Sequence, residues 1–373
     1  MAARRSNHEG SITRRKDGRW VARVTLEGGK RKNLYAKTRQ EAAKLLTAAL
    51  RDRDVGLPLV GERQTVSQYL DSWLDAIEHS VKPRSHHSYA GVIRRDVTPT
   101  FGRIVLSKLT AQHVQCLYAD KLKAGLSPTT VRHMHAVIHK ALDNAVRLDL
   151  VQRNVADLVQ PPRVKRLEMA TLSSEQSRLL LEAANGERFE ALVVLAVMTG
   201  MRIGELLGLR WSDVDVDVST LRVERTLHVI GGTPFFAEPK TELSRRRLLL
   251  PVRALRALIE HRERQRSEQD RLGEAWNDLD LVFPNRIGRP EDPRSFTRRE
   301  FEPLLRKAGL PHIRFHDLRH TAATLLLEEG INPKVVQEML GHAHISITLG
   351  LYAHVTPKML QTAARKMDEL LGS

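Results

Sequence analysis

The hydrophobic pattern of this chain changes its period after the first forty residues, and this change restricts the fold more than any other feature. Residues 10–14, 19–26 and 31–36 are three short runs of strand type, separated by the turn sequences KDG and EGG. Beyond them, apolar residues recur mainly at the spacing of an α-helix. The chain has 373 residues, enough for two or three domains of about 100 to 200 residues each. We therefore expect a multidomain, mainly α protein with small β elements.

The first expected domain covers residues 1–55. A helix should follow its three strands, because Thr38 is a natural N-cap and Glu41 stands three residues later, which is the spacing of a capping box. A three-stranded sheet backed by one helix is the expected result. The segment 55–63 contains two glycines and a proline and is typical of a linker.

Two further domains are expected beyond this linker. Residues 64–160 keep a helical period, and Thr110 and Ser127 stand where helix N-caps are expected, which predicts a bundle of four or five helices. The stiff, basic stretch 160–166 is typical of a linker that lies on a polyanion. Residues 168–373 predict an α+β domain. Its expected elements are helices at 173–185 and 189–199, strands near 221–229 and 246–250, and further helices to the end.

The chain carries a strong excess of positive charge, with 60 Lys and Arg against 44 Asp and Glu and a formal net charge of +16. Such an excess favours polyanionic partners, nucleic acid first and an anionic membrane surface second. The first 55 residues hold 15 basic and 6 acidic residues, a balance of +9. A β-ribbon or sheet edge fits the major groove of DNA, and the alternative is a solvated basic face that aids solubility. The candidate DNA contacts on this first sheet are Arg14, Arg15, Arg19, Arg23 and Arg31.

Cysteine content and hydropathy exclude several classes of protein. The one cysteine, Cys116, rules out an internal disulfide or a Cys-rich zinc site, and a lone thiol is usually a small core residue. The longest apolar run, 191–198, is far shorter than the roughly 18 residues needed to cross a bilayer. The first ten residues also lack the apolar stretch of a signal peptide. We therefore expect neither export nor membrane anchoring.

Two segments of the last region carry charged residues suited to a phosphodiester. In TGMRIGEL, Arg202 and Glu205 are three residues apart, so the carboxylate can hold the guanidinium fork in a fixed pose. In EPKTELSRRRLLLP, Pro239 forces an extended approach to Lys240, whose ammonium then lies at a hairpin tip. Three arginines at 245–247 crowd the same hairpin, so the assignment of the lysine stays open.

Three more segments follow in order. In FHDLRHT, His316 and Arg319 stand at i and i+3 of a helix whose other face is apolar. In NPKVVQEMLGHAH, the glycine at 341 ends a helix, so His342 lies just past that end. In SITLGLYAH, Tyr352 follows His342 by ten residues in another short helix, which Gly350 makes less stable.

The joint order of these residues is more specific than any one of them. It runs Arg with Glu at i+3, Lys, His-x-x-Arg, Leu-Gly-His, and Tyr ten residues later. This order resembles the tyrosine recombinase family, most specifically over residues 170–373 and at the level of architecture elsewhere. In phage-type integrases of this family a small N-terminal domain binds arm-type DNA sites, and a helical core-binding domain and a catalytic domain clamp the crossover site. The resemblance implies an arm-binding domain at 1–55, a SAM-like core-binding domain at 64–160 and the catalytic domain at 168–373.

The resemblance also implies a covalent mechanism. Tyr352 would attack the scissile phosphate to give a 3'-phosphotyrosine and a free 5'-hydroxyl, so that a phage or other mobile element is integrated and excised without ATP. Arg202 and Arg319 would hold the non-bridging phosphate oxygens, where charge builds up in the transition state. Neither a metal nor another cofactor is implied.

Four more residues have roles by the same resemblance. Lys240 would protonate the leaving 5'-oxygen, and His316 would assist proton transfer. His342 would donate a further hydrogen bond to the phosphate, and Glu205 would orient a neighbouring side chain.

Three alternatives remain at this point. HDLRH approximates a zinc protease pattern of two histidines at i and i+4, although Asp317 is shorter than the usual Glu. A DNA-binding regulator or a decayed integrase without catalysis would keep the basic features but could lose Tyr352. Type IB topoisomerases share similar chemistry, but by resemblance the basic N-terminal module favours recombination.

The implied partner is double-stranded DNA with core-type and arm-type attachment sites. The C-terminal helix, opened by Thr356 and Pro357, carries an apolar stripe that packs either in its own core or on a neighbouring subunit. Relatives use such a segment to assemble on two duplexes, so we expect a homotetramer on DNA. Whether an excisionase and a host DNA-bending protein take part stays open. The expected location is the bacterial cytoplasm, at the nucleoid.

Overall fold

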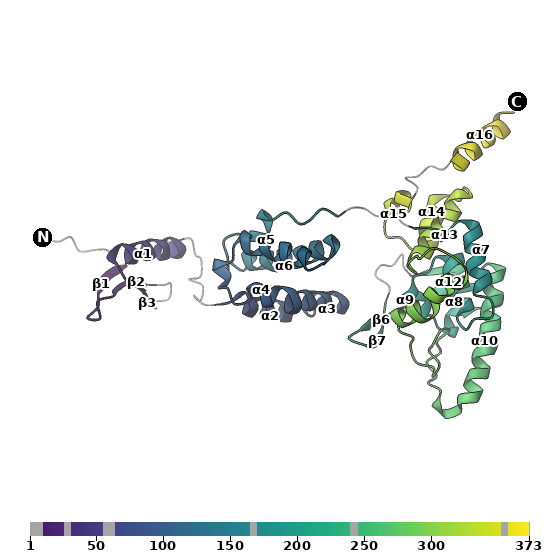
Figure 1. Ribbon diagram of the computed structural model, residues 1–373, viewed down its shortest axis with the longest axis horizontal. Helices are drawn as coiled ribbons and strands as arrows, with labels where there is room; N and C mark the ends of the chain where they lie inside the picture. The colour runs from purple at the N-terminus through teal and green to yellow at the C-terminus, as the bar shows by residue number, and fades with distance from the viewer. Residues whose placement is uncertain are drawn as a thin grey trace. The chain divides into compact units, whose positions relative to one another are not determined.

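The computed structural model of the chain describes residues 10–25, 31–54, 64–164, 170–238, 245–351 and 357–372. Residues 1–166 and 167–373 form two compact units. Figure 1 shows that helices dominate both units and that the sheets are small. This confirms the predicted multidomain, mainly α fold class. Within the described residues, none of the helices combines the length and the apolar character that a membrane span needs.

The N-terminal module is an antiparallel sheet covered by one helix. Its elements are β1 (Ser11–Arg14), β2 (Trp20–Thr25), β3 (Arg31–Ala36) and α1 (Arg39–Asp54), and the strand order is β1-β2-β3. The predicted capping box is formed: the Glu41 amide donates to Thr38 Oγ1 at 3.1 Å, and the Thr38 amide donates to Glu41 Oε2 at 3.2 Å. A small apolar core lies between β2, β3 and α1, so the helix covers one face of the sheet.

A helical bundle follows in the same unit. Its helices are α2 (Val66–Ile77), α3 (Pro83–Val92), α4 (Thr98–Phe101), α5 (Ala111–Lys123) and α6 (Pro128–Arg147), with a π-helical turn at Ile93–Val97 between α3 and α4. Thr110 and Ser127 cap α5 and α6 as predicted. The expectation that Cys116 is a core residue is wrong. The buried stripe of α5 is Val114, Leu117 and Tyr118, and Cys116 lies off that stripe and is exposed.

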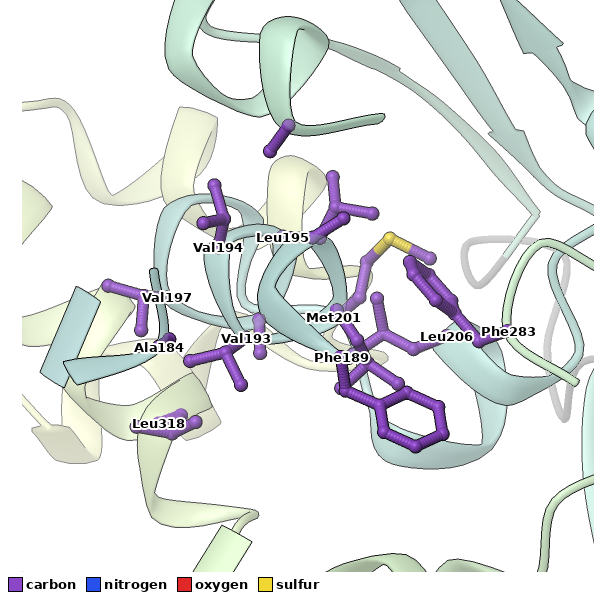
Figure 2. Packing of buried hydrophobic residues seen from close by; sticks show 14 of the residues in the cluster. Ala184, Phe189, Val193, Val194, Leu195, Val197, Met201, Leu206, Phe283 and Leu318 are labelled. Atoms are coloured by element: carbon purple, nitrogen blue, oxygen red, sulfur yellow. The ribbon is translucent and has the colours of Figure 1, made fainter. Parts of the chain in front are cut away.

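The second unit is built around α8 (Glu190–Thr199), which is buried on nearly all sides. Figure 2 shows Val193, Val194 and Leu195 of this helix among the apolar residues of the main core. The other helices of this unit are α7 (Ser174–Ala183), α9 (Ile203–Leu207), α10 (Val252–Leu272), α11 (Pro293–Phe296), α12 (Glu302–Lys307), α13 (Asp317–Glu328), α14 (Pro333–Leu340), α15 (Ile345–Leu351) and α16 (Pro357–Leu371). α8 packs against both α10 and α13. Its ends are therefore held in place, and with them the residues that directly precede and follow it.

Two small sheets complete this unit. One has the order β4-β5-β8, with β4 (Val214–Asp215), β5 (Thr220–Val223) and β8 (Arg246–Leu249) antiparallel. The other is the hairpin of β6 (Thr226–Ile230) and β7 (Thr233–Ala237), joined by two glycines with positive φ. The predicted single strand at 221–229 is therefore wrong. The segment is divided between the two sheets, and the break falls where the Arg225 side chain turns to pair with Asp213.

Candidate active site

The start of α9 holds the first pair of site residues. α8 ends at Gly200, whose φ of 64° is left-handed, and the chain then enters α9 with Arg202 at the N-cap and Glu205 three residues later. The Arg202 amide donates to Glu205 Oε2 at 3.1 Å, and Arg202 Nη1 lies 2.6 Å from Glu205 Oε1. The structure thus brings together the two residues that the sequence spacing paired.

Glu205 also contacts a second arginine. Arg246 on β8 reaches it with Nη2 at 2.9 Å from Oε2, and both side chains are buried. Burial alone would raise the pKa of the Glu205 carboxyl, but Arg246 and Arg202 outweigh it and hold that pKa below its usual value. Glu205 is therefore an anion at neutral pH, held between two guanidinium groups.

Arg319, on α13, is the most deeply buried arginine of the site, with 3% of its surface exposed. Its Nη1 donates to the carbonyl of Gly200 at 2.9 Å, whereas its Nη2 has no hydrogen-bond partner among the described residues. Burial and the nearby Arg202 lower the pKa of Arg319 to about 9, so the group is still a cation at neutral pH. A buried, charged donor without a partner is costly unless a ligand satisfies it.

The two histidines of HDLRH lie beside Arg319. His316 is the N-cap residue of α13 rather than a residue inside the helix, and its ring meets that of His320 edge to face at 5.0 Å. Partial burial, together with the cations around it, lowers the pKa of His316 to about 4. Asp317 is tied to Arg314, with 2.7 Å between Oδ1 and the guanidinium. No group of three or more potential metal ligands occurs in the part of the chain that the structure describes.

His342 lies past the end of α14, as predicted. Gly341 ends this helix with a φ of 67°, and Arg202 Nη2 donates to its carbonyl at 3.4 Å. The His342 ring is buried, and its Nδ1 is 2.9 Å from Thr348 Oγ1 on α15. Burial, then Arg319 and Arg202, lower the pKa of His342 to about 3, so this ring is neutral at pH 7.

Two predicted site residues, Lys240 and Tyr352, lie outside the described residues. Sequence reasoning missed two others that the structure brings into the site, Arg246 and Thr348. The run RRRLLL at 245–250 gives no alternation from which an inward-facing arginine could be chosen. Thr348 follows His342 by six residues in another helix, and no local rule pairs residues at that distance.

The charges of this cluster do not cancel. Arg202, Arg246 and Arg319 face one carboxylate, Glu205, while His316 and His342 are neutral at pH 7. Three cations and one anion leave an excess of two positive charges in a largely buried place. Such an arrangement is suited to an oxyanion whose charge increases during a reaction.

The five N-terminal arginines are all exposed, but they do not share one face. Arg23 alternates with core residues of β2, and Arg31 pairs in register with Thr25, so both lie on the face away from α1. Arg14 pairs with Trp20, which packs on the core, and therefore lies on the helix side. Arg15 and Arg19 flank the turn, and both contact Asp17. The five candidate arginines therefore do not form one surface: two lie on the face away from α1, one lies on the helix side and two flank the turn.

Comparison with known proteins gives the family. Residues 170–359 match the model of the phage integrase family. The chain belongs to this family. Residues 65–123 also match the N-terminal SAM-like domain of phage integrases, within the helical bundle. The prediction of a tyrosine-type site-specific DNA recombinase is confirmed.

Curated relatives match over nearly their whole length. A "tyrosine recombinase XerC-like" protein of Caldanaerobacter subterraneus subsp. tengcongensis is 32% identical over 95% of this chain and 97% of its own. An integrase of Streptomyces ambofaciens is 30% identical over 99% of this chain and 98% of its own.

Solved structures support the fold of this family member. The Tn1549 transposon integrase in complex with a circular intermediate DNA has a TM-score of 0.65 at 22% identity, covering 82% of this chain and 99% of that one. A lambda integrase tetramer bound to a Holliday junction has a TM-score of 0.59 at 18% identity, covering 95% and 99%. The likeness extends over both units of the present chain.

Proposed function

We propose that this recombinase integrates and excises a phage or other mobile element, with Tyr352 as nucleophile and the cluster around Arg319 as the site that holds the scissile phosphate. The observation that carries this proposal is the buried Nη2 of Arg319, which has no partner among the described residues. Its companion Nη1 is fixed by the Gly200 carbonyl, so the guanidinium is already oriented before a phosphate arrives. Arg202, oriented by Glu205, supplies the second guanidinium.

The proposed reaction conserves the phosphodiester energy. Tyr352 Oη forms a bond to phosphorus, the bond from phosphorus to the 5'-oxygen breaks, and the product is a 3'-phosphotyrosine with a free 5'-hydroxyl. Lys240 gives a proton to the departing 5'-oxygen, and the tyrosine proton leaves with the help of His316. Attack by a 5'-hydroxyl of the partner strand reverses these steps. The chemistry takes place without ATP or another cofactor.

The state of the histidines supports these roles. A His316 ring whose pKa is lowered to about 4 is neutral at pH 7, so one of its ring nitrogens keeps a lone pair that can accept a hydrogen bond from the tyrosine hydroxyl. The contact of His342 Nδ1 with Thr348 fixes that ring, and we assign its Nε2 to the phosphate. Because neither ring is charged beforehand, the positive charge that the phosphate meets comes from the arginines and the lysine.

We propose double-stranded DNA as the partner, contacted by three domains: 1–55 at arm-type sites, 64–160 at the core site and 168–373 at the scissile phosphate. The Tn1549 integrase is in complex with a circular intermediate DNA in its structure, and the lambda integrase tetramer is bound to a Holliday junction. Arg23 and Arg31, which are exposed on the face of the N-terminal sheet away from α1, are the strongest candidates for the arm contact. We place the protein in the bacterial cytoplasm at the nucleoid, with an excisionase and a host DNA-bending protein as candidate partners.

We further propose a homotetramer on two duplexes, joined through α16. Met367, Leu370 and Leu371 of this amphipathic helix are exposed, so the stripe is open to another subunit. Truncation after Thr356 is expected to abolish recombination while binding to a single site remains. Recombination at the normal rate by the truncated protein would contradict the tetramer proposal.

The decisive experiment is a covalent trap. A duplex from the junctions of the integrated element, nicked near the crossover, loses the strand end needed for rejoining and accumulates protein on its 3' end. Wild type should form this adduct and Tyr352→Phe should not, whereas Tyr35→Phe, which removes an exposed hydroxyl from β3, should react normally on a duplex without arm sites. Adduct formation by Tyr352→Phe would overturn the assignment.

A further inference from the structure

Three consecutive arginines, Arg245 just before β8 and Arg246 and Arg247 at its start, have different surroundings. Arg245 pairs with Glu238 at the surface, at 2.8 Å, and half of its side chain is exposed. Arg247 donates from Nε to Thr220 Oγ1 at 3.1 Å and is exposed too. Arg246 points the other way, as strand alternation requires, and only 6% of its side chain is exposed. One arginine of the three is therefore placed in the interior, beside the site.

Arg246 connects two segments that are far apart in the sequence. Its Nη2 lies 2.9 Å from Glu205 Oε2 at the start of α9, and its Nε donates to the Met339 carbonyl of α14 at 2.7 Å. The carbonyls at the C-terminal end of a helix lack intrahelical partners and carry the negative end of its dipole, so a cation there is favourable. The same guanidinium thus fixes both the carboxylate behind Arg202 and the helix that leads to His342.

We propose that Arg246 is a positioning residue for strand cleavage, which sets the pose of Arg202 through Glu205 and the place of His342 through the end of α14. This inference rests on the proposed roles of Arg202 and His342. Arg246 acts through other residues, because its Nε and Nη2 are already engaged by protein groups. Without it, Glu205 keeps one guanidinium partner instead of two, and the Met339 carbonyl loses a charged donor.

Arg246 and Glu205 are strongly coupled because both side chains are almost inaccessible to solvent. Glu205 is 2% exposed and Arg246 is 6% exposed, so removal of either partner leaves a buried charge with incomplete pairing. When one partner is removed, we expect the charged groups that remain around it to move. A displacement of about 1 Å at a reacting centre costs about 10²-fold in rate, so the effect should appear in the chemical step.

The test uses the full-length protein with three variants: Arg246→Met, Arg246→Lys and the control Arg247→Met. Single-turnover formation of the 3'-adduct on the nicked duplex is measured together with DNA affinity and thermal stability. Arg246→Met should slow adduct formation by about 10²-fold with DNA affinity unchanged. Arg246→Lys should recover part of that loss, because an ammonium keeps the charge but does not span both partners. Arg247→Met removes the same charge from the other face of β8 and should react at the wild-type rate.

A double-mutant cycle separates positioning from general destabilisation. Because Arg246 acts in part through Glu205, the loss of rate in Arg246→Met combined with Glu205→Gln should be smaller than the product of the two single losses. Multiplication of the two losses, or equal losses in Arg246→Met and Arg247→Met, would overturn the proposal. If Arg246→Met unfolds at the assay temperature, the cycle is run with Arg246→Lys instead.

Arg202→Lys on the same substrate distinguishes a failure of the proposed function from a failure of the inference about Arg246. If Arg202→Lys cleaves normally, the proposed function of the cluster fails. If Arg202→Lys is slow and both Arg246 variants cleave at the wild-type rate, the inference about Arg246 fails and the proposed function stands.

Discussion

Arginines are prominent in two regions of this chain, and their surroundings in the two regions are opposite. In the unit formed by residues 167–373, the side chains of Arg246 and Arg319 are buried, and their donors are held by backbone carbonyls and by Glu205. On the N-terminal sheet, Arg23 and Arg31 are exposed on the face away from α1. A fixed guanidinium contributes to the rate through geometry, whereas an exposed one contributes to affinity through charge. Substitutions in the two regions should therefore change different measured quantities.

The largest expected effect is at Arg319. Arg319→Lys keeps the charge but loses the fork that reaches both the Gly200 carbonyl and the phosphate, so adduct formation should fall by about 10²- to 10³-fold. Rates on the nicked duplex measure this loss, and affinity for the duplex should change little. A loss of affinity as large as the loss of rate would break the comparison, because Arg319 would then act as an ordinary charge contact.

The next effect concerns the backbone that holds Arg319. A side chain at Gly200 would overlap Leu340 and press on Ala322, and the residue has a φ of 64°. Gly200→Ala should therefore lower the free energy of unfolding by about 1 to 3 kcal/mol and slow cleavage as well, since the carbonyl that orients Arg319 moves. Gly18→Ala is the matched control in the N-terminal turn, where φ is also positive but the space is open. Denaturant titration of both should show the larger loss at Gly200, and equal losses would contradict the packing argument.

A smaller effect is expected from pH. His342 has its pKa lowered to about 3 in the folded chain, against about 6.5 when unfolded, so between these values the unfolded chain binds a proton that the folded chain does not. The contribution of His342 to the free energy of unfolding is therefore complete above about pH 7 and is lost as the pH falls. Between pH 7 and pH 5, wild type should lose up to about 2 kcal/mol more than His342→Gln. Denaturant titrations at both pH values measure the difference, and parallel losses would mean that the ring is protonated in the folded protein.

The smallest effect belongs to the exposed arginines. If Arg23 and Arg31 each neutralise a phosphate, Arg23→Ala with Arg31→Ala should reduce the slope of log affinity against log salt by about 0.9 per contact at an arm site. Arg14→Ala, on the helix side of the sheet, should leave that slope unchanged, and deletion of residues 1–55 should flatten it further. If Arg23→Ala with Arg31→Ala also changed adduct formation on a duplex that has only the core site, the exposed arginines would affect the rate as well, and the proposed difference between the two regions would fail. An unchanged slope after the deletion would refute arm binding.

Local signals predicted much of the secondary structure. The capping box at Thr38 and Glu41, the caps at Thr110 and Ser127, and the glycine end of α14 all involve residues three or four positions apart, so the sequence contains the whole interaction. The pairing of Arg202 with Glu205 is local in the same sense. The strand at 221–229 was predicted wrongly because its break depends on a contact with Asp213, which lies outside the segment.

By itself, then, the sequence determined the order of the elements, the family and the residue types available to the site, because caps, periods and motif spacings are short-range. Only the tertiary structure decided which arginine of RRRLLL turns inward, that Arg319 rests on the Gly200 carbonyl, and that His342 contacts Thr348. These contacts join residues from separate helices and strands, and burial selects among them. A charged group is stable in the interior only where partners from several elements meet it, and no stretch of sequence contains those partners together.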